Sequence, residues 1–576
     1  MEDEPIVKSE NPRHHRLALP ALVVFCLALY FTGLGIRPLW NQDEGMHAGT
    51  SMDMLRTGDW ITPTVNGEVF FDKPALHNWL VAVSLRVLGP TEFAARLPNA
   101  IMGLATVVVL FVIGRRMFGP GPAFLGSVVL ATSAQFFALS RTVMHDMTLT
   151  FCVTAGLGLF YVGASHDFRQ RRWFISAAAV LGLAVLAKGP AGLILPGAVA
   201  FFYLVLRREL PRVWQMAPGW GIVIFLAVTA PWYIAVAAAN PDFVSYFLVE
   251  LNVGSFVSSE STHPAPFWYY VPVLAGTLIP WSLFLPVALW RSFRQRAADP
   301  RGETLFLLLW IGVYLVFFSM AVSKLATYIL PMFPPAALLI GRLWHDFMCT
   351  RDPRLGRALG WSVLPAVSVF PALIAFRILD PNPDFLELYG LSLLLATLPL
   401  VVFATGVLWA GVLAYRGRPR GAFGTVTGSA VAMSGLILVI IAPALNPHQT
   451  SKRLVIEMDE RVPPGESLTM LGKLRDTALF YTERRVRLLP DHDPSALEAY
   501  LATSRIAYCL VDAKRWVDWG SPGHALTRNG RDVLIANEAG LAATLPAPGG
   551  DSEHDTGSLA GREERAAGEA LDPTLP

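Results

Sequence analysis

The sequence predicts an all-α protein that crosses a membrane many times and carries a small α/β domain near its C-terminal end. The first observation is composition: 53% of the 576 residues are hydrophobic and only 16% are charged, whereas a soluble chain carries about 25% charged residues. The second is that charge is absent from whole stretches, including 18–35, 306–320 and 391–415. Runs of about 20 apolar residues are long enough to cross the hydrocarbon core of a bilayer as helices.

We count about 13 apolar segments from their length and from the charged breaks between them. They begin near residues 18, 94, 120, 146, 173, 190, 218, 268, 304, 326, 360, 388 and 424. Basic clusters precede the first segment and follow the second, where Arg115 and Arg116 lie, and the later clusters keep to the same side. The positive-inside rule makes that side cytoplasmic. We therefore expect a multi-pass membrane protein with a cytoplasmic N-terminus and, since the number of segments is odd, a C-terminal region on the outer side.

Composition divides the chain into four expected parts. Residues 1–17 form a cytoplasmic N-terminus, and the first apolar run reads as an uncleaved signal anchor. Residues 18–445 form the membrane part, with a long outer loop over 37–93. Residues 446–545 form an α/β domain outside the membrane, in which SLTMLG, RVRLLP and RIAYCLV are expected strands and RDTALFYTE and PSALEAYLATS are expected helices. Residues 546–576 are rich in Gly, Glu, Asp and Ala and are expected to be disordered.

Several classes of function are disfavoured. The four cysteines are scattered and form no CxxC pair, which argues against a disulfide framework or a cysteine zinc site. There is no tract of Lys and Arg that would indicate nucleic acid as a partner. No glycine-rich phosphate loop stands between a strand and a helix, so no nucleotide site is expected.

The charged residues of the outer loops are the candidates for chemistry. Asp43 and Glu44 precede MHAGTSMDML, whose helical spacing suggests a helix lying in the membrane interface. Asp72 and Lys73 follow a glycine-centred turn. Asp146 begins an apolar segment, where a favourable interaction with the helix dipole would by itself explain a carboxylate.

Other charged residues lie at the outer ends of apolar segments. They include Arg141, Lys188 and Lys324. Lys324 and Tyr328 are four residues apart, so in a helix they would share a face and could hold a phosphate. A snorkelling interfacial cation is the alternative for each lysine. His263 lies beside prolines and aromatic residues, and it could complete a metal site with Asp72, although a solvated loop histidine is the simpler interpretation.

The order of the motifs along the chain carries a resemblance. They are WNQDEGMHA, GDWITPTVNGEVFFDKPALHNWL, RLPNA, MHDMTL, AKGP, HPAPFWYY and SKLATYILPMFPPAALLIG. Together, over about residues 37–341, they resemble the GT-C superfamily of membrane glycosyltransferases, and within it the aminoarabinose (lipid A) transferases and protein O-mannosyltransferases. The resemblance implies a GT-C fold and an enzyme that moves a sugar from a polyprenyl (undecaprenyl) phosphate carrier on the outer face of the membrane. It also implies that this membrane is the bacterial inner membrane, so that the C-terminal domain is periplasmic.

The same resemblance assigns roles residue by residue. It implies that Asp43, with its neighbour Glu44, engages the acceptor hydroxyl, and that Asp146 is the acidic residue of the second outer loop. It places Lys73, Lys324 and Tyr328 at the carrier phosphate, where Arg141 is a further candidate. His263 matches a histidine that is associated with a metal, so a zinc ion held by Asp72 and His263 is left open. The family usually has Glu where this chain has Asp72.

The expected chemistry is direct displacement with inversion. A hydroxyl or a phosphate of the acceptor attacks the anomeric carbon. If it is a hydroxyl, a carboxylate can take its proton, and cations neutralise the leaving phosphate. Asp43 is the first choice for the base and Asp146 the rival. The sugar and the acceptor stay open, because lipid A, another envelope glycan or a protein would each suit. A transporter or flippase of lipid-linked sugars is the alternative of a different class, but such proteins tend to place charges near the midplane in repeated halves.

Overall fold

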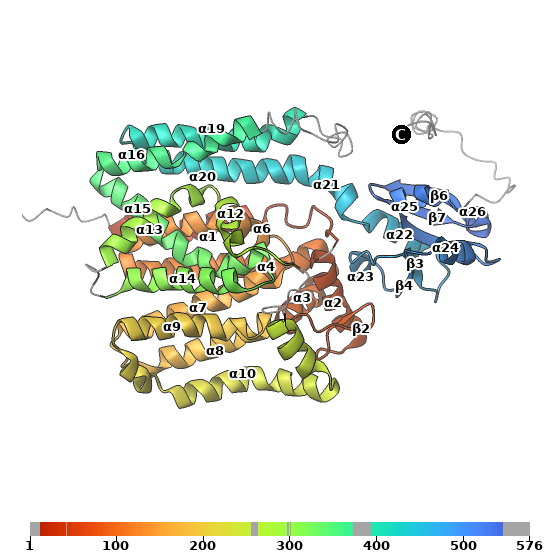
Figure 1. Cartoon of the computed structure of the whole chain (residues 1–576), viewed down its shortest axis with the longest axis horizontal. Helices are drawn as coiled ribbons and strands as arrows, with labels where there is room; N and C mark the ends of the chain where they lie inside the picture. The colour runs from red at the N-terminus through yellow and green to blue at the C-terminus, as the bar shows by residue number, and fades with distance from the viewer. Residues whose placement is uncertain are drawn as a thin grey trace, which may run out of the picture.

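The computed structural model describes residues 12–41, 43–254, 263–296, 299, 301–372 and 393–544. Long helices lie side by side in one body, and a mixed sheet with short helices lies at one end of that body (Figure 1). Within the described residues, seven helices are long and apolar enough to cross a membrane. They are Glu92–Phe118, His145–Ser165, Pro218–Ala239, Glu303–Met320, Ala326–Thr350, Leu394–Tyr415 and Pro419–Gln449. The total of about 13 spans stays a prediction, and the start near residue 388 lies outside the described residues.

The bundle follows the apolar segments of the sequence. Its helices in chain order are α1 (Pro12–Phe31), α4 (Glu92–Phe118), α5 (Pro120–Ala131), α6 (Ala134–Leu139), α7 (His145–Ser165), α8 (Arg171–Lys188), α9 (Ala191–Leu206), α10 (Pro218–Ala239), α12 (Tyr270–Thr277), α13 (Leu285–Gln295), α14 (Glu303–Met320), α15 (Phe333–Thr350), α16 (Pro353–Ser362), α19 (Leu393–Tyr415), α20 (Pro419–Leu436) and α21 (Ala442–Gln449). Shorter turns of helix connect them: η1 (Leu210–Met216), η2 (Ser245–Gly254), η3 (Phe267–Tyr269), η4 (Trp281–Leu283), η6 (Ala326–Met332), η7 (Leu364–Ser368) and η8 (Ile437–Ile441).

The first outer loop is a folded unit. It contains α2 (Asp43–Thr57), a hairpin of β1 (Thr64–Val65) and β2 (Glu68–Val69), and α3 (Leu76–Leu88). The sequence predicts the helix α2. It does not predict that other parts of the chain pack against more than one side of this helix. Its glycines explain the close packing: a Cβ on Gly45 would lie 2.6 Å from the backbone nitrogen of Thr477, and one on Gly49 would lie 2.3 Å from Cβ of Leu479. The helix is thus held against the C-terminal part of the chain.

The C-terminal part is a five-stranded sheet in the order β4-β3-β5-β7-β6. Its strands are β3 (Leu468–Leu471), β4 (Val486–Leu489), β5 (Tyr508–Asp512), β6 (His524–Asn529) and β7 (Asp532–Ala536), and its helices are α22 (Lys452–Arg461), α23 (Ala478–Tyr481), α24 (Pro494–Leu501), α25 (Ala513–Asp518) and α26 (Glu538–Thr544). The three expected strands and both expected helices are confirmed. The β6–β7 hairpin was missed. The domain boundaries at 446 and 545 and the periplasmic location stay predictions.

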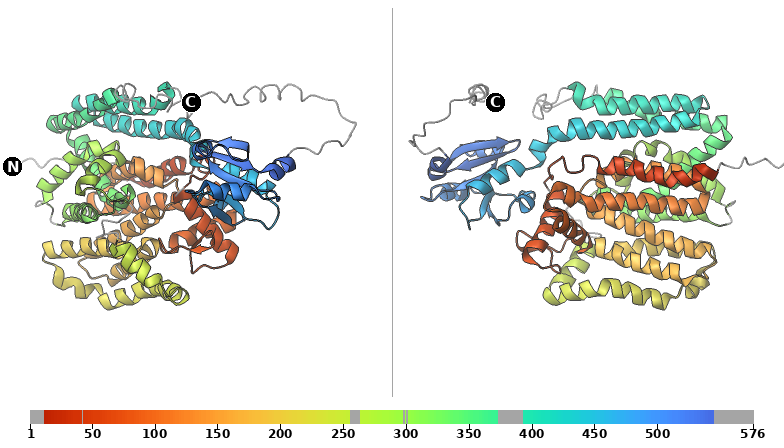
Figure 2. Two further views of the ribbon diagram at one scale, coloured as in Figure 1. Left: turned by 45° about the vertical axis from the view of Figure 1, so that its right-hand side comes forward. Right: turned by 180° about the vertical axis from the view of Figure 1, so that it is seen from behind.

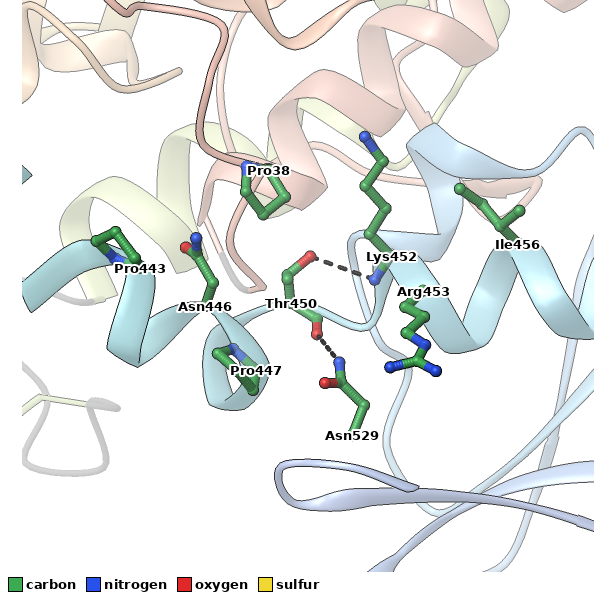
Figure 3. A pocket seen from close by; sticks show the side chains of 9 residues that line it. All are labelled: Pro38, Pro443, Asn446, Pro447, Thr450, Lys452, Arg453, Ile456 and Asn529. Carbon is green, nitrogen blue, oxygen red and sulfur yellow. Dashed lines mark hydrogen bonds between the residues drawn. The ribbon is translucent and has the colours of Figure 1, made fainter. Parts of the chain in front are cut away.

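The chain passes from the bundle to this sheet through α21 and α22 (Figure 2). At the junction Thr450 accepts a hydrogen bond from the Lys452 backbone nitrogen at 3.3 Å, and its carbonyl accepts one from Asn529 at 3.4 Å (Figure 3). A cavity of about 350 Å³ lies between these residues and Pro38. Nearby, the ammonium of Lys452 lies 2.5 Å from the carboxylate of Glu92, which starts α4. These contacts connect the sheet to the bundle.

Replacing Gly49 with Val tests the packing of α2. The added side chain would collide with Leu479, and overpacking a tight contact costs about 1–3 kcal/mol. We expect the purified protein in detergent to unfold at a lower temperature than the wild type. Gly197→Val is the matched control, because a Cβ on that helical glycine meets nothing within 4 Å. Equal unfolding temperatures for the two variants would contradict this account.

Candidate active site

The structure brings ionisable residues from four segments of the chain together in one cluster. Asp43 begins α2, Asp72 and Lys73 follow β2, Asp146 lies in the first turn of α7, and Lys188 ends α8. The Lys73 ammonium lies 2.8 Å from the Asp72 carboxylate. Lys188 forms an ion pair with Asp146.

Tyr328, in η6, closes this group on one side. The Lys188 ammonium lies 4.8 Å from the centroid of the Tyr328 ring, in a cation–π contact. Tyr328 also lies within the electrostatic reach of Lys73 and of all three carboxylates. We call Asp43, Asp72, Lys73, Asp146, Lys188 and Tyr328 the ionic pocket.

The carboxylates of the ionic pocket are not equivalent. Asp43 has no hydrogen bond or ion pair among the described residues, and its side chain is exposed. Partial desolvation and the negative charge of Asp146 raise the pKa of Asp43. Burial would also raise the pKa of Asp72, but the adjacent Lys73 ammonium holds that pKa below its usual value. Asp43 is therefore the pocket carboxylate that is free to accept a proton.

Glu44 lies apart from the ionic pocket, although it was a candidate with Asp43. It is only 3% exposed, and both its oxygens accept hydrogen bonds from Arg96, at 2.6 and 2.9 Å. It also accepts from the backbone nitrogen of Trp40 at 3.0 Å and pairs with Arg37 at 3.1 Å. Burial opposes its ionisation, but these positive partners hold the pKa of Glu44 below its usual value. This geometry fits a residue that positions α2 better than one that meets a substrate.

The charged group of Arg141 also bonds to other parts of the chain. Its guanidinium donates to the carbonyls of Leu29, Tyr30 and Thr32, at 3.0, 2.9 and 2.8 Å. These carbonyls lie at and just beyond the C-terminal end of α1. The last carbonyls of a helix have no hydrogen-bond partner within the helix itself. Arg141 therefore caps α1, and the structure does not group it with the ionic pocket.

Lys324 and Tyr328 do not share one helix, so the condition for a common helical face is not met. The helical turn begins at Ala326, and Lys324 lies in extended chain, next to the bridge that pairs Ser323 with Pro264. The Lys324 ammonium is buried and donates to the carbonyls of Ala265, at 2.9 Å, and Ala321. Of the pair, only Tyr328 faces the ionic pocket.

A metal site receives no support from the geometry. His263 is exposed, and its backbone carbonyl accepts a hydrogen bond from Lys324 at 3.0 Å. Asp72 is paired with Lys73. Across the part of the chain that the structure describes, no group of three or more His, Cys, Asp or Glu side chains is arranged to hold a metal ion. The zinc hypothesis for Asp72 and His263 stays a prediction.

Three buried histidines beside the ionic pocket were missed. The ring centroids of His47 and His145 lie 4.3 Å apart, and those of His77 and His145 lie 4.5 Å apart. His77 contacts Thr148 at 3.1 Å, while both ring nitrogens of His145 have no partner among the described residues. Burial lowers the pKa of His47 to about 4, so its ring is neutral at neutral pH. The sequence held a signal, since each histidine lies within four residues of Asp43, Lys73 or Asp146.

Comparison with known proteins identifies the family. A protein of Pseudomonas fluorescens named undecaprenyl phosphate-alpha-4-amino-4-deoxy-L-arabinose arabinosyl transferase 2 is 30% identical over 557 residues, covering 93% of this chain and 91% of the relative. The chain belongs to this arabinosyl transferase family. The recognition of a GT-C glycosyltransferase from the ordered motifs is thereby confirmed. Residues 72–234 also match the family described as dolichyl-phosphate-mannose-protein mannosyltransferase.

A second sequence match is shorter, and two solved structures share the fold. The undecaprenyl phosphate-alpha-4-amino-4-deoxy-L-arabinose arabinosyl transferase of Aeromonas salmonicida is 33% identical over 345 residues, so the match spans 59% of this chain and 62% of that relative. The fold matches ArnT from Cupriavidus metallidurans bound to undecaprenyl phosphate, with a TM-score of 0.75, 24% identity, and coverage of 92% of this chain and 99% of that one. The archaeal oligosaccharyltransferase AglB from Archaeoglobus fulgidus matches with a TM-score of 0.51 and 14% identity, over 87% of this chain and 69% of that one.

Replacing Glu44 with Gln tests the positioning role. The change leaves the guanidinium of Arg96, which is 1% exposed, without its charge partner. Removing one member of a buried ion pair costs about 3–5 kcal/mol. We expect a large fall in unfolding temperature in detergent. A double variant, Glu44→Gln with Arg96→Met, should recover part of that loss. A single variant that is as stable as the wild type would contradict the positioning role.

Proposed function

We propose that this protein is an inverting glycosyltransferase that moves a sugar from a polyprenyl phosphate carrier to a hydroxyl-bearing acceptor at the membrane surface. One observation carries the proposal: three carboxylates and two ammonium groups from separate elements converge in the ionic pocket at the ends of membrane helices. Such a pocket can take a proton from a hydroxyl and hold a phosphate. Family membership supports the same reaction class.

Asp43 is the proposed base. It is exposed and unpaired among the described residues, and its raised pKa favours proton acceptance. Asp146 is paired with Lys188, so we assign it the role of orienting that lysine. In the reaction the acceptor oxygen bonds to the anomeric carbon as the bond from that carbon to the phosphate oxygen breaks. The hydroxyl proton moves to Asp43, and the carrier leaves as polyprenyl phosphate.

Lys73 and Lys188 are the proposed phosphate ligands, with the Tyr328 hydroxyl as a further donor. Both ammonium groups are paired with pocket carboxylates, which hold them in place. Lys324 and Arg141 already donate to backbone carbonyls, so we assign them to holding the loops around the pocket. We propose His263 as a loop residue without a metal.

The names of the relatives supply the donor of the proposal, an undecaprenyl-phosphate-linked 4-amino-4-deoxy-L-arabinose or a related sugar. For the acceptor we propose a lipid A-like glycolipid of the envelope, as the resemblance of the ordered motifs implies. The protein would lie in the bacterial inner membrane, with the ionic pocket and the C-terminal sheet on the periplasmic side. The match of residues 72–234 to protein mannosyltransferases favours a protein hydroxyl as the second candidate acceptor.

Replacing Asp43 with Asn tests the base. The amide cannot take up the proton, so we expect transfer from a polyprenyl-phosphate sugar to fall by at least about a hundredfold, the lower end of general-base contributions. Expression and unfolding temperature should not change. Asp242→Asn, at another exposed carboxylate, is the control. Transfer at the wild-type rate would exclude Asp43 as the base.

The pH profile offers a second test of Asp43. As pH falls, a carboxylate with a raised pKa is protonated earlier than an ordinary aspartate. The rate at limiting donor and acceptor should therefore fall on the acid side, with a midpoint above the usual aspartate value. Asp43→Glu should shift this midpoint while retaining part of the activity. A profile that is flat through the acid range would contradict a role for an ionising carboxylate.

Replacing Lys188 with Met tests phosphate binding. The change removes the cation that pairs with Asp146 and contacts Tyr328. We expect the KM for the donor to rise by about tenfold or more, since a hydrogen bond to a charged group contributes about 1.5–3 kcal/mol. Lys188→Arg should recover part of the affinity. An unchanged KM for the donor would remove Lys188 from the phosphate site.

A further inference from the structure

A second cavity, of about 410 Å³, lies where the C-terminal sheet meets the first outer loop. Asn41, His448 and Gln449 come from the membrane part of the chain, and the remaining lining comes from the sheet and its loops. Arg475 and Arg515 are among the charged residues in that lining. No role in the proposed transfer reaction has been given to this cavity, which we call the junction pocket.

The topology of the sheet puts the junction pocket where α/β sheets bind ligands. β3 lies between β4 and β5 and is parallel to both. The chain leaves β3 for β4 on one side and then crosses to β5 on the other. The two connections cover opposite faces, since Ala478 of α23 packs in one core and Leu497 of α24 in the other.

Such a switch point leaves a crevice beyond the carboxyl ends of the two strands, and ligands bind there. The residues that follow β3 and β5 supply the wall: Leu471 to Asp476 after the first strand, and Asp512 and Arg515 after the second. Gly472 makes the first turn at a φ of +72°, and a Cβ there would lie 2.4 Å from Cβ of Asp491. Glycine therefore keeps the crevice open at the end of β3.

The acidic residues of the junction pocket are all engaged. Asp532 accepts from Arg475 at 2.6 and 3.0 Å, and Asp491 pairs with Arg515 at 2.8 Å. Asp512 caps α25 by accepting from the Arg515 backbone nitrogen at 3.1 Å, and Asp476 also has a partner.

Two cations of the same wall are not engaged. Lys473 and Arg531 line the junction pocket, and neither side chain has an ion pair or hydrogen bond among the described residues. Both are exposed. With every acid committed, these two positive charges are available to an incoming anion, and an arginine and a lysine together suit a phosphate.

We propose that the junction pocket binds a phosphate group on a sugar. Lys473 and Arg531 would meet the phosphate, while Gln449 and the paired arginines offer hydrogen bonds to neighbouring hydroxyls. Taking that ligand to be the head group of the acceptor rests on the proposed transferase function. The binding site itself does not rest on that function.

The junction pocket is connected to the ionic pocket through Asn41. The Asn41 side chain accepts from the Thr477 hydroxyl at 2.6 Å and donates to Ser451 at 3.3 Å, and Ser451 in turn donates to Asp532 at 3.0 Å. Asn41 stands two residues before Asp43. A head group held in the junction pocket would therefore lie beside the chain that leads into α2.

The test uses the full-length protein in detergent and a double variant, Lys473→Gln with Arg531→Gln. Titration calorimetry with inorganic phosphate and with glucose 1-phosphate measures the site. We expect affinity for both probes to fall by at least about tenfold. Lys514→Gln with Arg505→Gln is the matched control, because those cations are exposed on the same domain outside the junction pocket. Unchanged affinity in the pocket variant, or an equal loss in the control, would overturn the proposal.

A conservative variant separates charge from shape. Lys473→Arg with Arg531→Lys keeps both charges and should retain most of the affinity, with an unfolding temperature equal to that of the wild type. Loss of binding in this variant as complete as in the glutamine variant would count against a charge-based site.

Two further experiments identify the source of the phosphate. Lipid A in detergent micelles should compete with glucose 1-phosphate, and the pocket variant should raise the KM for a lipid A acceptor while leaving turnover of the donor unchanged. Competition without any transfer activity in the wild type would support the site and contradict the transferase function. No competition by lipid A would overturn the acceptor assignment.

Discussion

The contact between Glu44 and Arg96 is the constraint on which the arrangement of the site depends. The guanidinium has five N–H donors, and its five hydrogen bonds reach the two oxygens of Glu44 and the carbonyls of Leu34, Arg37 and Pro38. One side chain of α4 thereby holds the chain that leaves α1 and the first turn of α2. Asp43 precedes Glu44 directly, so its direction is set by this buried network. The cost of burying both charges is offset because every lone pair and donor has a partner.

The C-terminal sheet, together with this ion pair, holds α2 in place. Glycines at 45 and 49 bring the backbone of α2 against α23, and Tyr481 donates to Glu92 at 3.0 Å while accepting from the Leu39 nitrogen at 2.8 Å. The outer helix therefore lies between two bodies and is held from both. A loop anchored on one side only would leave Asp43 free to move relative to Lys73 and Asp146. Catalytic groups need to be held within a fraction of an ångström of their working geometry.

The sequence predicted what depends on local pattern and missed what depends on distant partners. Apolar runs located the described helices because hydropathy is a property of the segment itself. Asp72 and Lys73 were both named as candidates, although their ion pair was not predicted. Glu44 and Arg141 were taken for site residues because both are charged and near the outer side. The partner of Glu44 lies 52 residues away in α4, and the partners of Arg141 lie about 110 residues away at the end of α1. A local sequence pattern cannot indicate partners at such distances along the chain.

Two other misses have different causes. Gly530 and Arg531 make the turn between β6 and β7. The Asn-Gly dipeptide at 529–530 is a strong hairpin signal, and it was present in the sequence but not used. The buried histidines were hidden by their spacing along the chain, since His47, His77 and His145 come from three elements that meet only in the folded state.

The charge of the ionic pocket suits the proposed reaction. Three carboxylates face two ammonium groups, and this excess of negative charge is one reason why the pKa of Asp43 is raised. A bound carrier phosphate would add another negative charge and raise that pKa further, so binding the donor would make Asp43 a stronger base. As the glycosyl bond breaks, the phosphate gains a charge while the acceptor proton arrives on Asp43. The total charge of the pocket then stays constant through the step, which spares a partly buried site the cost of a net charge change. The neutral histidines beside it fit this balance, because a protonated imidazole there would hold Asp43 ionised at the expense of its basicity.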